Sequence, residues 1–180
     1  MGKIMKQEKE ELTGLYTADT AKMMIEEYLE KEQENVGMIV LDLDGFEQVN
    51  TMFDREKGDE FLLDTSYILQ QSFSEDDIIY RSREDEFVIF LKHCQENTNL
   101  NIRLYELCTT LEREITDGLN TCIVTASIGV ATSKCCKSSV DDLYACARKA
   151  MQEVKTTGKD DVKFYYQKGD CDELSGSKSE

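Results

Sequence analysis

The sequence predicts an α/β (α+β) fold, in which a split βαβ sheet is mostly antiparallel and has helices packed on it. Three observations point to this fold class. Apolar runs of strand length alternate with segments whose apolar residues recur at helical spacing. Two strand-like runs flank a charged turn, as in an antiparallel hairpin. The resulting order is helix, strand, helix, hairpin, helix, strand, helix, strand, and its two strand–helix–strand units favour a split βαβ sheet.

The first three elements follow from periodicity. Apolar residues at helical spacing predict a first helix over residues 17–33. A continuous apolar strand comes next and ends at Asp42. A second amphipathic helix is expected to begin just after Gly58 and Asp59.

The hairpin is predicted from two short β-rich runs, residues 78–80 and 87–91, on either side of a charged turn. Asp85 should lie in or beside this turn. Arg83 and Glu84, both bulky and charged, fall in its tightest part. The chemistry available to the chain therefore depends largely on these two residues.

The second half of the chain repeats the alternation. Residues 100–115 carry a third amphipathic helix, and residues 122–130 alternate in strand fashion. A fourth helix over residues 140–154 should end near Gly158, and a strand over residues 162–166 follows.

Length and composition indicate one domain. The 180 residues suffice for one ordinary hydrophobic core, and no internal stretch is rich enough in Gly, Ser or Pro to act as a linker. We expect a polar lead-in over residues 1–9, a folded domain over residues 10–166 and a disordered tail over residues 167–180.

The charge limits the partners. A formal net charge of −16 disfavours a nucleic-acid polymer or an anionic membrane, because both require a basic surface. A single nucleotide remains possible, since one metal ion and one or two lysines suffice for it. The chain shows no signal peptide and no apolar run long enough to cross a bilayer, so a cytoplasmic protein is expected.

The seven cysteines include no C-x-x-C pair, and His93 is the single histidine. Structural zinc is therefore not expected, and most thiols should fill core positions in a reducing compartment. Cys135 and Cys136 are most simply a loop pair, with an exposed redox-sensitive thiol as the alternative. His93 is expected at the surface.

Two acidic islands stand at the ends of apolar runs. Asp42 and Asp44 close the first predicted strand, and Asp85 and Glu86 lie at the hairpin turn. A carboxylate at a strand end that faces another from a neighbouring turn can hold a divalent cation and the triphosphate attached to it. The bland alternative is a pair of solvated strand-end carboxylates.

Several short motifs resemble one known family when taken together. They are EELTGLY at 10–16, DLDGFEQVN at 42–50, GD at 58–59, ASIGVA at 126–131, LYACA at 143–147 and KTTGK at 155–159. In this order and spacing they resemble the GGDEF domain, a relative of the polymerase palm with a ferredoxin-like sheet, over roughly residues 10–166. Active members of that family join two GTP molecules into cyclic di-GMP.

The resemblance implies a metal site. Asp42 and the Leu43 carbonyl would hold Mg²⁺ (or Mn²⁺), and Asp85 in the signature turn would share it, because this cation prefers compact oxygen ligands. If the domain is active, Asp85 and Glu86 would be catalytic, with Glu86 as the candidate base or second metal ligand.

The resemblance also implies a nucleotide site. Asn50 and Asp59 match the positions that hydrogen-bond guanine, and Lys155 and Lys159 match the basic pair on the terminal phosphates. Lys159 stands where the family usually has Arg, which keeps the charge but loses the planar fork. The bland alternatives are that Asn50 suits a turn, that Asp59 is an N-cap, and that the lysines interact with a helix dipole.

The departures from the family concern the phosphate pocket. The signature reads REDEF at 83–87, so Arg83 and Glu84 replace two glycines that let the phosphates approach the backbone closely. Their side chains should block that space, and Glu84 adds a negative charge beside a triphosphate. The family's Lys after Phe46 is Glu47 here, and the product-binding motif R-x-x-D has become SEDD at 74–77.

These departures predict a degenerate GGDEF domain that lacks diguanylate cyclase activity. It would act as a nucleotide-sensing module for GTP or another guanine nucleotide, or as an interaction module with a signalling-protein partner. One alternative is an active diguanylate cyclase, which requires a homodimer because each subunit supplies one GTP. The other is a purely structural scaffold with an empty site.

Overall fold

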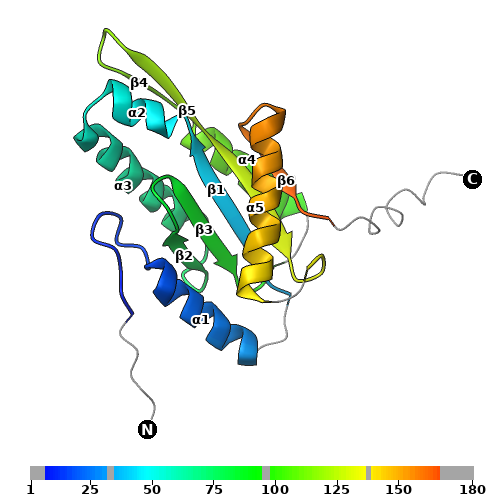
Figure 1. Ribbon diagram of the computed structural model, residues 1–180. Helices are drawn as coiled ribbons and strands as arrows, with labels where there is room; N and C mark the ends of the chain where they lie inside the picture. Colours follow the sequence, from blue (N-terminus) through cyan, green and yellow to red (C-terminus); the bar gives the residue numbers. More distant parts are fainter. Residues whose placement is uncertain (1–6, 32–34, 95–97, 137–138, 167–180) are drawn as a thin grey trace, which may run out of the picture.

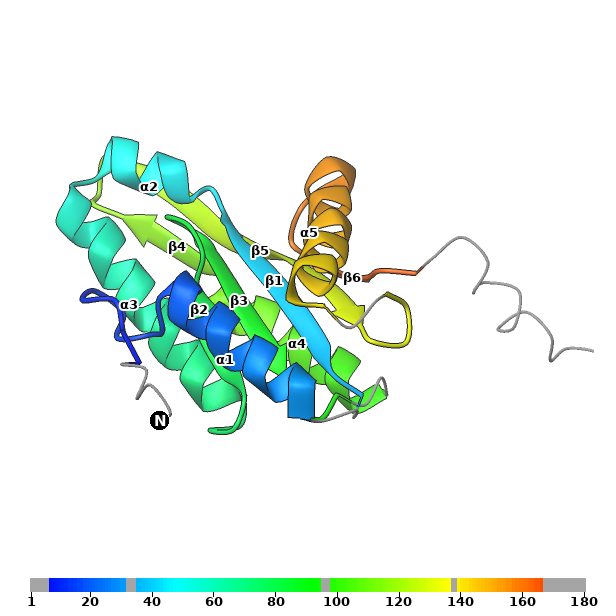
Figure 2. The ribbon, with the colours of Figure 1, turned by 60° about the horizontal axis from the view of Figure 1, so that its bottom comes forward.

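A six-stranded sheet covered by helices on both faces forms the body of the computed structural model (Figures 1 and 2). The structure describes residues 7–31, 35–94, 98–136 and 139–166. Residues 1–6 of the expected lead-in and the expected tail over 167–180 lie outside the described residues. The elements in chain order are α1 (Ala18–Lys31), β1 (Gly37–Asp44), α2 (Phe46–Met52), α3 (Arg55–Ser72), β2 (Ile78–Arg81), β3 (Glu86–Leu91), α4 (Thr98–Leu111), β4 (Arg113–Thr116), β5 (Thr121–Thr132), α5 (Val140–Thr157) and β6 (Asp161–Phe164).

The predicted fold class is confirmed by the sheet. Its strand order is β2-β3-β1-β5-β4, with β6 pairing with β5. All pairs are antiparallel except β5 with β6. The first strand β1 is central, and all eight of its residues are buried. In register, Asp42 of β1 lies between Glu86 of β3 and Ser127 of β5.

Two hydrophobic layers sandwich the sheet. Residues of β1 alternate between them, because successive side chains in a strand point to opposite faces. Ile39 and Leu41 pack in the layer that contains α3 and α4. Met38 and Val40 pack in the layer that contains α1 and α5. Asp42 continues the second series, so the alternation directs its carboxylate toward α5.

The helix α5 lies directly on the sheet at Gly129. A Cβ added to Gly129 would lie 2.0 Å from the Ala147 carbonyl oxygen and 2.3 Å from the Met151 nitrogen. Only glycine permits such a close approach of helix backbone to strand. This contact fixes how closely α5 packs on the sheet, and therefore how close its side chains lie to the carboxylates at the end of β1.

Two short elements were not predicted. The helix α2 follows β1 through Gly45, whose φ of 85° turns the chain sharply. The strand β4 pairs with the start of β5, and Ile115 belongs to this strand, not to the preceding helix. The predicted third helix was therefore too long: α4 ends at Leu111. Only one residue of β4 is buried, so its short sequence lacks the alternation of apolar and polar residues by which a strand is recognised.

The predicted start of the second helix was wrong. α3 begins at Arg55, and Asp54 is its N-cap, accepting a hydrogen bond from the Lys57 N–H at 2.9 Å. Gly58 and Asp59 lie inside the helix, so Asp59 does not cap it. Of the two aspartates that could cap this helix, Asp54, the first in the sequence, does so.

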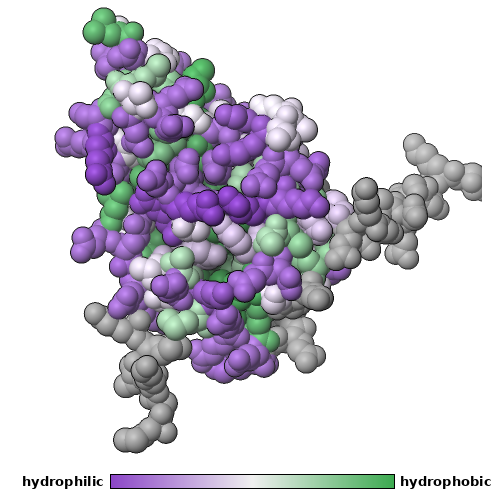
Figure 3. Space-filling model, viewed as in Figure 1, coloured by the Kyte–Doolittle hydropathy of each residue, from purple (hydrophilic) through white to green (hydrophobic). Residues whose placement is uncertain are grey.

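The surface is mainly hydrophilic in the view of Figure 3, and hydrophobic colour appears at the tip of the β4–β5 hairpin among other places. Leu119 at this tip is 95 % exposed. No helix in the described parts of the chain has the length and apolar character needed to cross a membrane.

The predicted surface position of His93 and the core positions of Cys94, Cys108 and Cys122 are confirmed. Cys135 and Cys136 follow β5 in a loop, as predicted, but both thiols are buried.

Candidate functional site

A row of acidic side chains crosses the end of the sheet beneath α5. Asp42 of β1 and Glu86 of β3 are direct neighbours in register, and they are 8 % and 1 % exposed. Asp44 lies two residues further along β1 and is also buried. Buried carboxylates need hydrogen-bond or charged partners, so the surroundings of each define what it can do.

Glu86 is fully engaged by its surroundings. Its Oε1 accepts hydrogen bonds from the Ser82 hydroxyl at 2.5 Å and the Tyr144 hydroxyl at 2.6 Å. Its Oε2 accepts one from the Arg148 Nε at 3.2 Å. Burial, followed by the contact with Glu86, raises the pKa of Tyr144, which keeps this hydroxyl protonated as a donor. Both carboxylate oxygens are thus occupied by internal donors.

Asp42 is held by the last turn of α5. The Lys155 ammonium contacts Asp42 Oδ1 directly. Burial raises the pKa of Asp42, Lys155 opposes this shift, and the negative charges of Asp44 and Glu86 add to it. The Lys155 cation is therefore the main group that favours the ionised form of this carboxylate.

Asp44 fastens the loop after α5 to the sheet. Its Oδ2 accepts hydrogen bonds from the Ser127 hydroxyl at 2.6 Å, the Thr125 hydroxyl at 3.3 Å and the Asp160 N–H at 3.4 Å. Its Oδ1 is buried and has no partner among the described residues. Asp160 and Lys159 have φ values of 50° and 68°, which side chains rarely adopt. Asp44 thus helps to hold the strained loop that presents Lys159.

The signature turn is braced from its own strand. The Arg81 Nε donates to the carbonyls of Arg83 at 3.1 Å and Glu84 at 3.0 Å, and its Nη2 donates to Glu84 at 2.6 Å. The Arg81 Nη1 also reaches both carboxylate oxygens of Glu10 at 3.4 Å. One guanidinium therefore fixes the turn to the segment that precedes α1.

Arg83 and Glu84 are exposed at this turn. Neither has a positive φ, so the replacement of two glycines has not forced the turn into a left-handed conformation. The Ser82 N–H and the Arg83 N–H both donate to the Glu86 carbonyl, at 2.9 Å and 3.4 Å. The N–H groups of Ser82 and Arg83 are therefore engaged inside the hairpin and are not free to bind a phosphate.

Asp85 lies beside the strand end of β1. Its carbonyl accepts a hydrogen bond from the Leu43 N–H at 3.1 Å, and its side chain is half-buried. Burial raises the pKa of Asp85, and the charge of Asp42 raises it further. The structure therefore brings Asp42, Leu43 and Asp85 together, as the resemblance implied.

The expected Mg²⁺ ligands remain a prediction. Within the described ranges, no three histidine, cysteine or acidic side chains form a group that could hold a metal ion by themselves. One oxygen of Asp42 pairs with the Lys155 ammonium, and both oxygens of Glu86 already accept hydrogen bonds. A divalent cation here would need further oxygens from a bound phosphate or from water, which Mg²⁺ commonly uses in proteins.

The two predicted guanine-binding residues lie on consecutive helices. Asn50 is exposed near the end of α2, in a helix and not in a turn, and Asp59 is half-exposed in α3. A Cβ on Gly58 would lie 2.2 Å from Asn50 Oδ1, which shows that the amide rests against α3 at Gly58, the residue before Asp59. Gly58 is thus required for this close approach. The amide and the carboxylate lie at the surface, available to a ligand.

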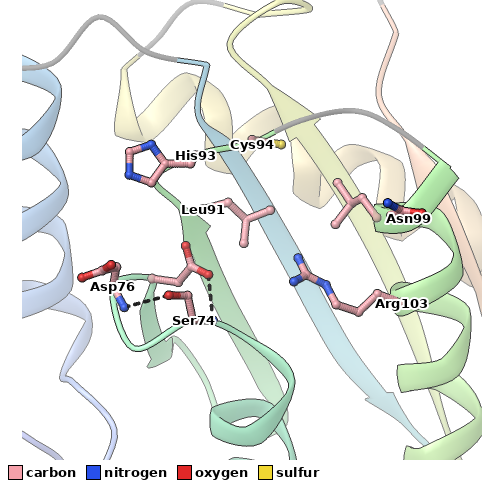
Figure 4. A pocket seen from close by; sticks show the side chains of 9 residues that line it. Ser74, Asp76, Leu91, His93, Cys94, Asn99 and Arg103 are labelled. Carbon is pink, nitrogen blue, oxygen red and sulfur yellow. Dashed lines mark hydrogen bonds between the residues drawn. The ribbon is translucent and has the colours of Figure 1, made fainter.

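The position of the lost product-binding motif is built as a tight turn. Asp77, its remaining residue, accepts hydrogen bonds from the Ser74 N–H at 3.1 Å and the Lys92 N–H at 3.2 Å. Beside it lies a cavity of ≈ 430 Å³, into which the side chain of Arg103 extends from α4 (Figure 4). Both oxygens of Asp77 therefore support the fold.

Sequence reasoning missed Tyr144 and Arg148 as members of the site, and it named Asp44 in the first acidic island without giving it a role. Asp44 carried a signal, because it stands in the same motif as Asp42. Tyr144 and Arg148 carried only a weak one: they are polar residues one helical turn apart, which indicates a shared face but not what it contacts.

The family model for the diguanylate cyclase GGDEF domain matches residues 9–161. Among curated relatives, the cyclic di-GMP phosphodiesterase PdeR of Escherichia coli is 26 % identical over 149 residues, covering 82 % of this chain and 22 % of the relative. The diguanylate cyclase DgcM of the same organism is 26 % identical over 129 residues, covering 72 % of this chain and 30 % of the relative. The chain thus spans less than a third of the length of these relatives.

Solved structures share the fold. The GGDEF domain of DgcB from Caulobacter crescentus, solved with c-di-GMP, matches with a TM-score of 0.76 at 18 % identity, covering 91 % of this chain and 98 % of the other. The FimX GGDEF domain from Pseudomonas aeruginosa matches with a TM-score of 0.73 at 17 % identity, covering 86 % and 97 %. With the family model matching most of its length, the chain belongs to the GGDEF domain family.

Proposed function

We propose that this domain lacks diguanylate cyclase activity and serves cyclic di-GMP signalling as a guanine-nucleotide-sensing module. The observation that carries the proposal is the state of Glu86. It is 1 % exposed, and three internal donors occupy its two oxygens. A general base must reach the proton that it removes, whereas Glu86 is buried and both of its oxygens already accept hydrogen bonds.

The phosphate end supports the same conclusion. Lys155, expected on the terminal phosphates, is paired with Asp42. The turn that would approach the phosphates carries Arg83 and Glu84, and its first amides donate to Glu86. A triphosphate would have to break these contacts before it could be neutralised and aligned for attack.

The guanine end supports nucleotide recognition. The Asn50 amide packs against α3 at Gly58, the residue before the half-exposed Asp59, and an amide and a carboxylate can pair with the acceptor and donor groups of guanine. Lys159 is exposed in the loop that Asp44 fastens, so a cation remains available near the site. The proposed ligand is therefore GTP or another guanine nucleotide, read without turnover. The nucleotide-bound form of the domain would then interact with a signalling-protein partner or with a second copy of the chain.

A turnover experiment at high protein concentration tests the proposal. Purified protein is incubated with Mg²⁺ or Mn²⁺ and an excess of GTP, so that both subunits of a dimer can be loaded, and the nucleotides are analysed by chromatography. The high protein concentration favours even a weak homodimer and makes one condensation per pair of subunits visible. We expect GTP to be recovered unchanged, whereas cyclic di-GMP above the level of an Asp42→Asn, Asp85→Asn control would overturn the proposal.

Calorimetry with GTP, GDP and ATP tests the sensing role separately. We expect heat and a thermal shift for the guanine nucleotides and weaker effects for ATP. No heat with any nucleotide would leave only a protein-interaction or scaffold role.

A further inference from the structure

We propose that Cys136 and Cys146 form a redox-sensitive thiol pair, which a hydroperoxide oxidises to a disulfide that ties the loop after β5 to α5. This inference goes beyond the proposed function and does not depend on it. Neither cysteine belongs to the carboxylate end or the guanine end of the candidate site, and the test uses no nucleotide.

The loop after β5 presents the Cys136 side chain to α5. The N–H groups of Cys135 and Cys136 both donate to the Thr132 carbonyl, at 3.0 Å and 3.2 Å, and the Cys136 Sγ donates to the same carbonyl at 3.2 Å. Cys136 is buried in the hydrophobic layer that contains Leu143 and Ala147 of α5. The turn therefore holds this thiol in a fixed position against the helix.

The Cys146 thiol meets Cys136 from the helix. The two thiols are in hydrogen-bonding contact, and the Cys146 thiol also contacts the Tyr165 hydroxyl after β6. Cys146 packs against the same hydrophobic layer and is half-buried, whereas Cys136 is 9 % exposed. Two sulfurs in such contact need only a small further approach to reach the bond length of about 2.05 Å of a disulfide.

The different burial of the two thiols assigns them different steps. Cys146 is accessible to solvent, so its thiolate attacks the peroxide oxygen, the O–O bond breaks, and a sulfenic acid forms on Cys146. Burial raises the pKa of Cys136, so this group remains a thiol until the sulfenic acid lies beside it. The Cys136 sulfur then displaces hydroxide from the Cys146 sulfur, and the hydroxide leaves as water with the Cys136 proton. Two thiols and one hydrogen peroxide thus give one disulfide and two molecules of water.

The positions of the other thiols favour this pairing. Every cysteine in the described ranges is a free thiol. Three of them belong to the hydrophobic layer of α3 and α4, on the opposite face of the sheet: Cys94, Cys108 and Cys122. Cys135 is adjacent to Cys136, and its Sγ accepts a hydrogen bond from the Thr132 hydroxyl at 3.8 Å. A bond between Cys135 and Cys136 is therefore the alternative that the experiment must distinguish.

A disulfide at this place would restrain the start of α5. The ring that it closes contains about the first two turns of the helix, which begins at Val140. A cross-link removes open conformations of the segment that it closes, so hydrogen exchange from the amides of that segment should slow. Tyr144 and Arg148, the two side chains of α5 that contact Glu86, flank Cys146 in the sequence. Oxidation of the pair would therefore stiffen the part of α5 that covers Glu86.

Oxidation followed by peptide mapping tests the inference. The protein is treated with hydrogen peroxide, the remaining thiols are alkylated under denaturing conditions, and tryptic peptides are identified by mass spectrometry. Trypsin separates peptide 135–137, which holds both loop cysteines, from peptide 138–148, which holds Cys146. We expect these two peptides to be joined by a disulfide that dithiothreitol removes.

Three single variants locate the bond. Cys135→Ser is the matched control, because it removes the adjacent thiol and should still give the linked peptides. Cys136→Ser and Cys146→Ser should each reduce the yield of linked peptides at least about tenfold. Cys146 is half-buried, so its serine variant and the parent protein provide the test even if Cys136→Ser does not fold.

Hydrogen exchange gives a second measurement. Amides at the start of α5 should exchange at least about threefold more slowly in the oxidised protein than in the reduced protein. Linked peptides that require Cys135 instead of Cys136, a bond within peptide 135–137, or a parent protein that forms no disulfide with peroxide would overturn the inference. Equal exchange rates in the two forms would overturn the claim that the bond restrains α5.

Discussion

The two ends of the candidate site are built in opposite ways. At the carboxylate end, Asp42 and Glu86 are buried and held by side chains of α5. At the guanine end, Asn50 and Asp59 lie on α2 and α3 with their polar groups at the surface. The first pair is committed to internal contacts, and the second is open to a ligand.

This difference shows that the type of residue at a position does not by itself determine what the residue does. Acidic residues stand at positions that the resemblance implied for a metal ion or for catalysis, and the oxygens of Asp42 and Glu86 make contacts within the fold. Removing a partner from such a network leaves a buried charge or donor unsatisfied, which is costly, whereas removing an exposed group costs little. The two ends should therefore respond oppositely to mutation.

The largest expected effect is loss of stability in Glu86→Ala. The change strips three donors of their acceptor and leaves Arg148 without its partner, so we expect a loss of about 2–4 kcal/mol in the free energy of unfolding. Urea denaturation followed by circular dichroism measures it. Glu84→Ala, two residues away but exposed, is the matched control and should change stability by less than about 0.5 kcal/mol. Equal effects from both variants would refute the structural role of Glu86.

The guanine end should show the reverse pattern. We expect the double variant Asn50→Ala, Asp59→Ala to weaken GTP binding by at least about tenfold, because two hydrogen-bonding groups are lost. Its unfolding free energy should stay close to that of the parent. Calorimetry with GTP and urea denaturation give the two values, and unaltered GTP affinity would show that the nucleotide is read elsewhere.

A smaller effect is expected for Tyr144→Phe. The substitution removes one hydroxyl that donates to Glu86 and keeps the ring, so a loss of about 1 kcal/mol in stability is expected. Thermal denaturation measures it. If the thermal midpoint were unchanged, the hydrogen bond to Glu86 would not contribute to stability.

The smallest effect concerns Asp85 and pH. Its pKa is raised by burial and by Asp42, so its ionisation costs stability that begins to be lost as the pH rises above the unfolded-state pKa and is fully lost above the raised folded-state pKa. Asp85→Asn should therefore be slightly more stable than the parent at pH 7, and the gain should shrink as the pH falls through the range in which carboxylates titrate. Asp76→Asn, on an exposed turn, serves as the control. A gain that grows toward acid pH would contradict this electrostatic account.

Much of the fold could be predicted because its long elements carry clear periods. The central strand, the hairpin and α5 were each visible in the sequence. The short elements α2 and β4 were not, since seven and four residues give too little repeat to recognise. The start of α3 was misplaced because the apolar run that reveals the helix begins at Phe61, just after Asp59, whereas the first turn after the true cap Asp54 is polar.

The site could be predicted for those residues that belong to short sequence motifs. The motifs indicated that Asp42 lies near Asp85, and they named Asn50, whose amide packs against α3 at Gly58. They could not reveal the partners from α5, because Tyr144 and Arg148 are 58 and 62 residues away from Glu86 along the chain. Such contacts depend on how a helix docks, which local patterns do not specify.

The most direct test of the account is the dependence of GTP binding on a divalent cation. Calorimetric titration with GTP is performed in excess EDTA and again in Mg²⁺ at matched ionic strength. Because base recognition at Asn50 and Asp59 is open while the carboxylates already hold their cations, the account predicts binding in both buffers with affinities within about twofold. Binding that appears only with Mg²⁺, or no binding in either buffer, would contradict it.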